Sequence, residues 1–322
     1  YDHYPMSAAY SRNLGLDFLG MTGKFHRAWG EFGGFKHPNA LRYECAAMLA
    51  HNSKCSIGDQ MHPDGELDQT TYELIGAAYQ EVEQKEPWCR NAHSLAEIAI
   101  LAEADTETGN VGASRLLLEQ HLPFDLVDAT MDFSRYRVIL AANEKEISSK
   151  TAEKLRAYLA AGGKLVLCSD SILKPGTCEP WFEFGAEFGE TSPSNPDYVR
   201  MKESFAGNFK TPFLMQLPSR RMKVTTALSL AEIYDSYFNR TARHFCSHQH
   251  TPNKPEASGY DAAAISGNIL YFAHPVFTLY RSTGAVMHKQ LFAHALSAFL
   301  GDQAQVVTGN LPSTGRVTLM RQ

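Results

Sequence analysis

The hydrophobic and polar positions of the first 90 residues predict two strand–loop–helix units in succession. Residues 16–21 form an apolar run that predicts a buried strand, and the polar, aromatic residues 22–37 follow it. Pro38 suits the first position of a helix. The apolar residues after it recur at the spacing of one helix face, at Leu41, Cys45, Met48 and Leu49.

A second unit of the same kind follows. Residues 55–58 predict a short strand that leads into the polar residues 59–63. Thr70 and Thr71 are expected to cap the next helix. The apolar face of that helix comprises Leu74, Ile75, Ala78 and Val82. Two such units in tandem, each with polar residues just after its strand, indicate the C-terminal face of a parallel barrel or sheet.

Residues 91–302 show a regular alternation of strands and helices, which implies a small doubly wound sheet of the flavodoxin type. Strands are predicted at residues 98–102, 124–127, 136–141 and 164–168, and helices at residues 113–121 and 148–161. The six prolines of residues 171–220 indicate a long insertion. Further strands are predicted at residues 222–227, 230–238 and 269–277, and a closing helix at residues 285–300.

The longest uncharged stretch, residues 262–280, has about the length of a membrane span. Its turn residues 266–268 favour a β-hairpin instead. Alternating residues at 305–307 and 316–320 predict the first strands of a further β domain.

Composition narrows the class of protein. The formal charge is −5, from 30 basic and 35 acidic residues without a block of like charge, which argues against nucleic acid or a membrane as a partner. The six cysteines contain no C-x-x-C spacing, which favours reduced thiols over a zinc ribbon. Between cytoplasm and periplasm, the cytoplasm is the favoured compartment.

The loop at residues 22–37 carries the densest candidate chemistry. It contains the carboxylate Glu31, the basic residues Lys24 and His26, and aromatic residues that include Trp29. Sugars stack their apolar ring faces on aromatic side chains and use their hydroxyls for hydrogen bonds, and a carboxylate can act as nucleophile or as acid/base. The alternative is a solvated loop with Trp29 packed into the core.

The polar residues after the second strand are a shorter case of the same kind. Gln60 and His62 are candidates for binding a hydroxyl. The alternative is a loop that approaches a helix, in which Asp59 makes local backbone hydrogen bonds. His3 and Tyr4 are also polar and aromatic, but they follow no predicted strand.

No cofactor is expected in the second domain. None of its strand–helix turns has the Gly-rich run that nucleotide phosphates require. Cys168 ends a predicted strand, where class I amidotransferase-like flavodoxin folds carry a nucleophile. Its neighbours lack the small glycines of a nucleophile elbow, so a buried, inert thiol is favoured.

His244, His248 and His250 alternate along one short segment, and alternating residues share a face of an extended chain. No acidic or Cys ligand stands at motif spacing, so no metal site is predicted. The segment is interpreted as a polar loop that reaches a ligand or a neighbouring subunit. A merely exposed loop is the alternative.

Four segments carry a resemblance to a known family: residues 2–5, 21–34, 56–63 and 245–252. The chain resembles bacterial glycoside hydrolases that join a (β/α)₈ barrel to a β-galactosidase-type trimerisation domain, and the family 151 α-L-fucosidases look nearest. The resemblance implies an α/β protein with three parts: C-terminal barrel strands at residues 1–90, a flavodoxin-like trimerisation-type domain at residues 91–302, and the start of a β domain at residues 303–322.

The resemblance also implies a function. The chain would be the C-terminal portion of a retaining exo-glycosidase, α-L-fucosidase-like or β-galactosidase-like, that removes terminal sugars from oligosaccharides as a homo-oligomer, a trimer or a multiple of one. Glu31 would be its nucleophile or acid/base. The sugar-binding residues would be His3, Tyr4, Lys24, His26, Trp29, Asp59, Gln60, His62, His248 and His250.

A complete barrel takes about 250 residues, and a retaining mechanism needs two carboxylates about 5–5.5 Å apart. Glu31 is the only carboxylate in a suitable place, so this chain alone is expected to be inactive. The alternatives are a non-catalytic oligomerisation or carbohydrate-binding module and, less favoured, an amidotransferase-like hydrolase that uses Cys168.

Overall fold

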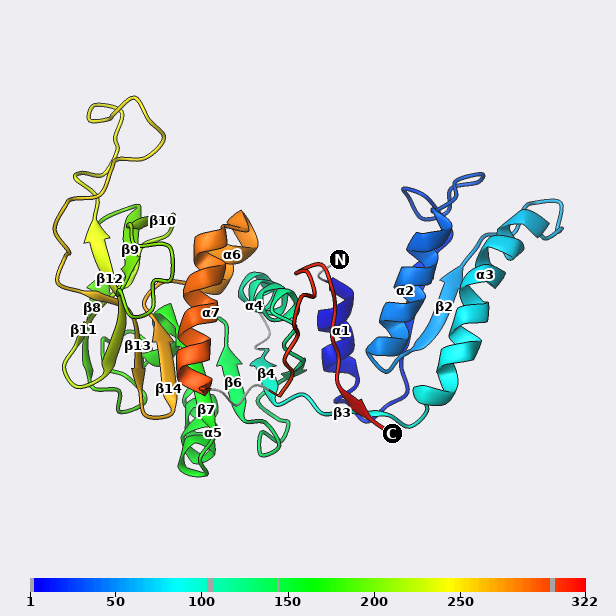
Figure 1. Ribbon diagram of the computed structural model, residues 1–322, viewed down its shortest axis with the longest axis horizontal. Coiled ribbons are helices and arrows are strands. Elements are labelled where there is room, and N and C mark those ends of the chain that lie inside the picture. The colour runs from blue at the N-terminus through cyan, green and yellow to red at the C-terminus, as the bar shows by residue number, and fades with distance from the viewer. Residues whose placement is uncertain (1–2, 103–106, 144, 302–304) are drawn as a thin grey trace. The chain divides into compact units, whose positions relative to one another are not determined.

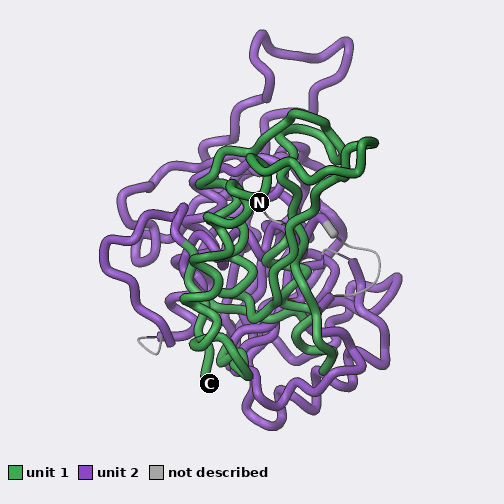
Figure 2. Tube along the Cα trace, turned by 90° about the vertical axis from the view of Figure 1, so that its right-hand side faces the viewer, with its two compact units in different colours: residues 1–96, 123–126, 316–322 green, residues 97–122, 127–315 purple. Residues whose placement is uncertain are grey.

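The computed structural model describes residues 3–102, 107–143, 145–301 and 305–322, and it divides into two compact units (Figures 1 and 2). Unit 1 comprises Tyr1–Ala96, Pro123–Leu126 and Arg316–Gln322, and unit 2 comprises Glu97–Leu122 and Val127–Gly315. The predicted α/β class is confirmed. The domain boundaries expected from the sequence stay a prediction.

Unit 1 contains the two predicted strand–loop–helix units. Its main elements are α1 (His3–Ser11), β1 (Leu19–Gly23), α2 (Pro38–Ala50), β2 (Lys54–Gly58) and α3 (Gln69–Lys85), followed by a 3₁₀ turn at Glu86–Trp88. β1 and β2 pair in parallel, from Leu19 opposite Lys54 to Gly23 opposite Gly58. The carboxyl ends of both strands therefore lie at the same edge of this small sheet.

The helices of unit 1 form because their apolar residues recur on one face. α2 buries Leu41, Cys45 and Leu49 against Ala78 and Val82 of α3. Burying each Leu or Val side chain contributes about 1.5–3 kcal/mol, which fixes the two helices to each other (Figure 1).

The expected cap of α3 is wrong. Asp68 is the N-cap residue, and its carboxylate accepts a hydrogen bond from the backbone N–H of Thr70 and another from the Thr71 hydroxyl. A carboxylate caps better than Thr and also interacts favourably with the positive end of the helix.

A nine-stranded sheet runs in the order β10-β9-β12-β13-β14-β7-β6-β4-β5. β4, β6, β7 and β14 pair in parallel, and β14, β13, β12, β9 and β10 pair antiparallel. The parallel strands are β4 (Ile98–Leu101), β6 (Val138–Ala141), β7 (Lys164–Cys168) and β14 (Ile269–Phe272), and β5 (Phe124–Val127) lies next to β4 at the edge of the sheet. The order of β5, β4, β6 and β7 agrees with the predicted flavodoxin-type winding.

The helices of unit 2 agree only in part with those predicted from the sequence. They are α4 (Glu107–Glu119), α5 (Ser149–Ala160), α6 (Val276–Thr283) and α7 (Val286–Leu300). A Cβ at position 112 would collide with the carbonyl of Phe277. Because Gly112 has no side chain, α4 can pack closely on α6. The strand predicted at residues 269–277 is too long: β14 stops at Phe272, and Pro275 caps α6.

The segment 171–220, predicted as a long insertion or excursion, contains short strands that the sequence did not predict. This segment contains β8 (Ala186–Thr191), β9 (Asp197–Met201) and β10 (Phe213–Met215), and leads into β11 (Arg220–Val224). β8 pairs with β11, whereas β9 pairs with β12 (Leu228–Asp235). The prolines lie outside these short strands, where they do not interrupt the hydrogen bonds of the sheet.

The last elements of the chain agree with the sequence-based prediction only in part. The predicted hairpin is confirmed, because β13 (Asp261–Ser266) turns into β14 at Gly267, whose φ is +52°. Residues 305–307 form no strand, and β15 (Met320–Arg321) pairs with β3 (His93–Ser94). A further β domain stays a prediction.

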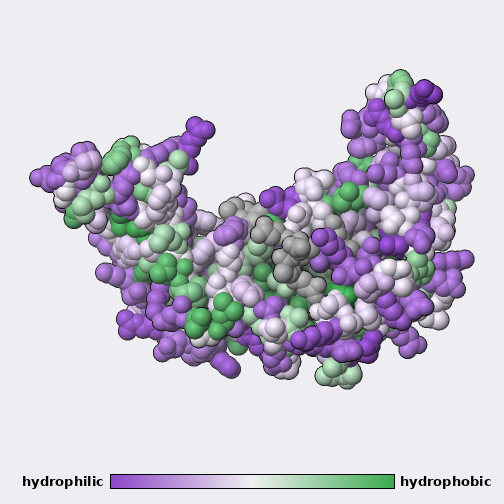
Figure 3. All heavy atoms as spheres, turned by 180° about the vertical axis from the view of Figure 1, so that it is seen from behind, coloured by the Kyte–Doolittle hydropathy of each residue, from purple (hydrophilic) through white to green (hydrophobic). Residues whose placement is uncertain are grey.

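None of the described helices is long and apolar enough to cross a membrane. Hydrophilic side chains predominate on the face of the molecule in Figure 3, with small apolar areas among them.

A buried carboxylate in unit 2 makes stability depend on pH. Asp197 accepts hydrogen bonds from the Ser219 amide (2.9 Å) and hydroxyl (2.6 Å), and His274 Nε2 lies 3.4 Å from its Oδ2. Burial alone would raise the pKa of Asp197, but His274 and Ser219 outweigh it and lower that pKa. A lowered pKa contributes stability above the unfolded value of about 3.9, and the contribution is lost as pH falls.

We expect Asp197→Asn to reduce the free energy of unfolding by about 1–3 kcal/mol at pH 7, because it weakens a buried charge-assisted network. Urea unfolding at pH 7 and pH 3 measures the effect. The gap between wild type and variant should narrow at pH 3, whereas the exposed control Glu153→Gln should change little at either pH. An equal gap at both pH values would contradict this assignment.

Candidate functional site

A cavity lies where two loops of unit 1 follow β1 and β2. The backbone N–H of Lys24 donates to the carbonyl of Gly58 (3.0 Å), which holds the two loops together just past the strands. The cavity has a volume of about 360 Å³ and extends to the first turn of α3. Four residues predicted for the site line it: Lys24, Asp59, Gln60 and His62. The structure thus brings both predicted loops to one cavity.

Lys24 is nearly fully buried at this cavity, with 4% of its surface exposed. Its Nζ lies 4.6 Å from the ring centre of Phe35 and 5.3 Å from that of Phe25. Asp59 Oδ1 is 3.9 Å from Nζ, too far for a hydrogen bond. The ammonium makes no hydrogen bond to any residue in the described part of the chain, so its three N–H donors are available to a ligand.

Gln60 and His62 supply further polar groups. The side-chain nitrogen of Gln60 is shielded from solvent and has no acceptor among the described residues. His62 is held in place, because its Nδ1 lies 2.7 Å from Asp64 Oδ2 and its ring packs edge-on against Phe32 at 5.7 Å. The cavity therefore combines donors and acceptors with an aromatic wall.

Trp29 lies over the ends of both strands rather than in the core. It is 66% exposed, and its ring packs against Gly58 so closely that a Cβ there would lie 2.2 Å from it. Phe25 meets the ring at 5.1 Å in an edge-to-face arrangement. Trp29 thus presents an exposed aromatic surface beside the strand ends, as stacking on a sugar requires.

Glu31 has a different position from the one the site would need. Its Oε2 accepts a hydrogen bond from the backbone N–H of Arg27 (2.9 Å), and its carboxylate contacts the backbone at Gly34. It is not one of the residues that line the cavity. In this structure Glu31 braces its own loop, and its catalytic role stays a prediction. His26 in the same loop is exposed.

The structure does not bring the remaining predicted residues to this cavity. Tyr4 lies on α1, where its hydroxyl bonds to Ser53 before β2, and burial raises its pKa to about 12. His3 contacts Ser7 on the same helix. His248 and His250 belong to unit 2. Asp2 lies outside the described residues.

Three acidic lining residues were not singled out in the sequence: Asp64, Glu66 and Asp68. The alternation of these carboxylates along the sequence, up to the cap of α3, could have indicated that they belong to the site. The loop from β2 to α3 lines the cavity beyond residues 59–63, to which the sequence analysis had limited the site.

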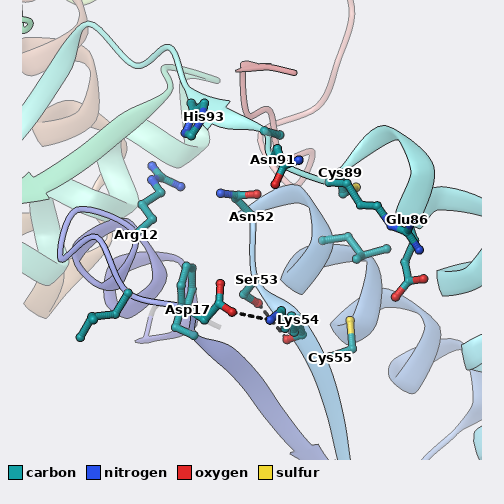
Figure 4. A pocket seen from close by; sticks show the side chains of 15 residues that line it. Arg12, Asp17, Asn52, Ser53, Lys54, Cys55, Glu86, Cys89, Asn91 and His93 are labelled. Atoms are coloured by element: carbon teal, nitrogen blue, oxygen red, sulfur yellow. Dashed lines mark hydrogen bonds and ion pairs between the residues drawn. The ribbon is translucent and has the colours of Figure 1, made fainter.

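A larger cavity, of about 540 Å³, lies beside the amino-terminal end of β2 (Figure 4). Arg12, Asn52 and Asn91 line it, and Lys54 forms an ion pair with Asp17 at 2.7 Å. Parallel barrels and sheets carry their chemistry at the carboxyl ends of the strands. We therefore take the smaller cavity as the candidate site.

Cys168 is fully buried. Its Sγ lies 3.7 Å and 3.6 Å from the carbonyl oxygens of Ala142 and Asn143. This is the environment of an inert thiol rather than of an accessible nucleophile.

The contact between Trp29 and Gly58 makes a testable prediction. Gly58→Ala would place a methyl group inside the Trp29 ring, so the ring must move away from the strand ends. In a Trp88→Phe, Trp181→Phe background, acrylamide quenching of Trp29 fluorescence should increase. Gly76→Ala on α3 is the control, since nothing lies near its Cβ position. Unchanged quenching in Gly58→Ala would show that Trp29 is not held there.

No protein-family model matches the sequence, and a search of curated proteins finds no match. Among solved structures, α-L-fucosidase isoenzyme 2 from Paenibacillus thiaminolyticus is 41% identical with a TM-score of 0.95, over 100% of this chain and 50% of that one. β-Galactosidase from Bacillus circulans sp. alkalophilus matches 96% of this chain and 49% of its own, at 14% identity and TM-score 0.69. The cold-adapted β-galactosidase from Rahnella sp. R3 matches 92% of this chain and 47% of its own, at 15% identity and TM-score 0.65.

The two β-galactosidases are similar in fold alone. The fucosidase is similar in sequence as well, over the whole of this chain. The chain spans about half the length of each of these solved structures.

Proposed function

We propose that this chain is the part of a retaining exo-glycosidase that helps to bind the terminal sugar of an oligosaccharide. Its sequence and fold are similar to those of a bacterial α-L-fucosidase. A fucoside is favoured over a galactoside, because the relative that is also similar in sequence is an α-L-fucosidase. The cavity between the loops after β1 and β2 is the observation that carries this proposal.

The size and chemistry of the cavity suit one sugar ring. Its volume, about 360 Å³, is at the lower end of the range for small-molecule sites. A hydroxyl placed between Lys24 Nζ and Asp59 Oδ1 would accept from the first and donate to the second, since those atoms are 3.9 Å apart. The Gln60 amide offers a further donor for a neighbouring hydroxyl.

Glu31 is proposed as nucleophile or acid/base of the complete enzyme. Arg27 donates to its Oε2, and Oε1 has no hydrogen bond to the described residues. One carboxylate oxygen is therefore fixed while the other is available. A second carboxylate about 5–5.5 Å away would complete a retaining mechanism.

Glu31→Gln tests this role in an active form of the enzyme that includes this chain. Glutamine keeps the acceptor for Arg27 but removes the charge, so the loop should persist while kcat/KM for an aryl fucoside falls about 10²-fold or more. Glu73→Gln, an exposed change on α3, is the matched control. An unchanged kcat/KM in Glu31→Gln would remove Glu31 from the chemistry.

One observation favours the second candidate function, a carbohydrate-binding module without catalysis. Glu31 braces its loop and does not line the cavity. If Lys24→Met abolishes sugar binding while Glu31→Gln leaves turnover intact, this chain binds the sugar and catalysis lies in other residues.

We also propose that unit 2 assembles the protein into a homo-oligomer and that an arm of unit 2, residues 236–253, reaches the sugar site of a neighbouring copy. The arm is braced internally: Ser236 bridges to Asn253, and His244 stacks on Phe238 at 3.7 Å. It forms the long yellow excursion of Figure 1. Its exposed side chains include Phe245, at 63%.

His248 and His250 lie on this arm and test the proposal. Light scattering should show an oligomer, and His248→Ala or His250→Ala should lower turnover about tenfold without dissociating it, the effect of one lost hydrogen bond. His93→Ala, at an exposed position outside the arm, is the control. A monomer with full activity would contradict both parts. Wild-type turnover in both variants would contradict the role of the arm.

A further inference from the structure

We propose that Cys45 and Cys55 are a redox-active pair of thiols, which a peroxide oxidises to a reversible disulfide between α2 and β2. Neither thiol takes part in the proposed sugar chemistry. The proposal therefore stands independently of the proposed function.

The two thiols lie in contact inside unit 1. Cys45 belongs to the buried cluster between α2 and α3, and Cys55, the second residue of β2, packs against that cluster. Cys55 Sγ lies 3.5 Å from the carbonyl oxygen of Cys45, and the two side chains are in hydrogen-bond contact. Because a disulfide needs Cβ atoms about 3.5–4.5 Å apart, thiols already in contact can form one with little movement of the backbone.

A cavity gives small oxidants access to the pair. Cys55 is half-buried and lines the cavity of about 540 Å³ beside the amino-terminal end of β2 (Figure 4). Cys45 is buried, with 1% of its surface exposed. An oxidant from solvent therefore reaches Cys55 first, and Cys45 reacts second from the interior.

The contact also gives the two thiols different roles. The hydrogen bond between them is the main reason that the pKa of Cys45 is lowered and the pKa of Cys55 is raised. Because the thiolate is the reactive form, Cys45 is the better nucleophile, as the second step requires. The first step, at Cys55, is slow, so the pair responds to sustained exposure to the oxidant.

The peroxide accepts the electrons that the thiols lose. The Cys55 thiolate attacks one peroxide oxygen, the O–O bond breaks, and the other oxygen takes the Cys55 proton and leaves as water. Cys55 is then a sulfenic acid. The Cys45 thiolate attacks the Cys55 sulfur, the S–O bond breaks, and the oxygen leaves as water with the proton that Cys45 released. The thiols thus lose two electrons and two protons, which reduce hydrogen peroxide to water.

Cys89 is the competing partner for Cys55. It lines the same cavity and packs against the same buried cluster. It acts on Cys55 through charge alone, which is a smaller effect than the hydrogen bond with Cys45. In the part of the chain that the structure describes, no three His, Cys, Asp or Glu side chains are placed to hold a metal ion. The geometry therefore favours a Cys45–Cys55 disulfide.

The disulfide joins two elements that frame the candidate site. Glu44, the neighbour of Cys45, accepts a hydrogen bond from Lys36 of the loop after β1 at 2.9 Å. β2 leads into Asp59 and Gln60. A crosslink also restricts the unfolded chain, so oxidation should make the folded chain harder to unfold.

Peptide mapping of the full chain tests the assignment. After treatment with hydrogen peroxide and alkylation of the remaining thiols, mass spectrometry should find the peptides of Cys45 and Cys55 joined. Their mass should be about 2 Da below the sum of the two reduced peptides, and dithiothreitol should separate them. A Cys55–Cys89 crosslink, or alkylation of both Cys45 and Cys55 after the treatment, would overturn the proposal.

Urea unfolding provides the second measurement. Oxidation should raise the midpoint for the wild type by about 1 M, the scale expected of a short crosslinked loop. The control Cys178→Ser, at a half-buried thiol of unit 2, should show the same rise, whereas Cys55→Ala should show none. A rise in Cys55→Ala equal to that of the wild type would contradict the proposal, since oxidation of other residues would then be the cause.

Discussion

The parallel pairing of β1 with β2 is the constraint on which the candidate site depends. It places Gly23 opposite Gly58, so the two loops with polar residues start at the same edge. Both positions lack a side chain. The Trp29 ring occupies the space that a Cβ would take at Gly58, and the Phe25 ring occupies most of that space at Gly23. If the register shifted by one residue, the side chains of a strand would exchange faces, and Trp29 would lose this surface.

The loop after β1 is held from both ends, which is why it can carry a binding site. The backbone N–H of Lys36 donates to the carbonyl of Lys24 (2.7 Å), which closes the loop on itself. The Lys36 ammonium then bonds to Thr22 at 2.7 Å and to Glu44 of α2 at 2.9 Å. These partly buried, charge-assisted bonds tie the loop to α2 and so fix where Lys24 reaches the cavity.

Local patterns predicted the parts of this protein whose contacts are local. Pro38 and the apolar face after it marked α2, because helix hydrogen bonds join residues close in sequence. The strands within residues 171–220 were missed, because β8 finds its partner β11 about 30 residues later and its short sequence has no strong alternation. The cavity residues after β2 were partly found, since polar residues past parallel strands converge. The hydrogen bond that turns Glu31 toward Arg27 depends on the loop conformation, which no pattern encodes.

A crystal structure of the chain with L-fucose tests the central claim most directly. The account predicts the sugar in the smaller cavity, with one hydroxyl within about 3 Å of both Lys24 Nζ and Asp59 Oδ1. A sugar bound in the larger cavity beside Lys54 and Asn91, with the smaller cavity empty, would contradict it.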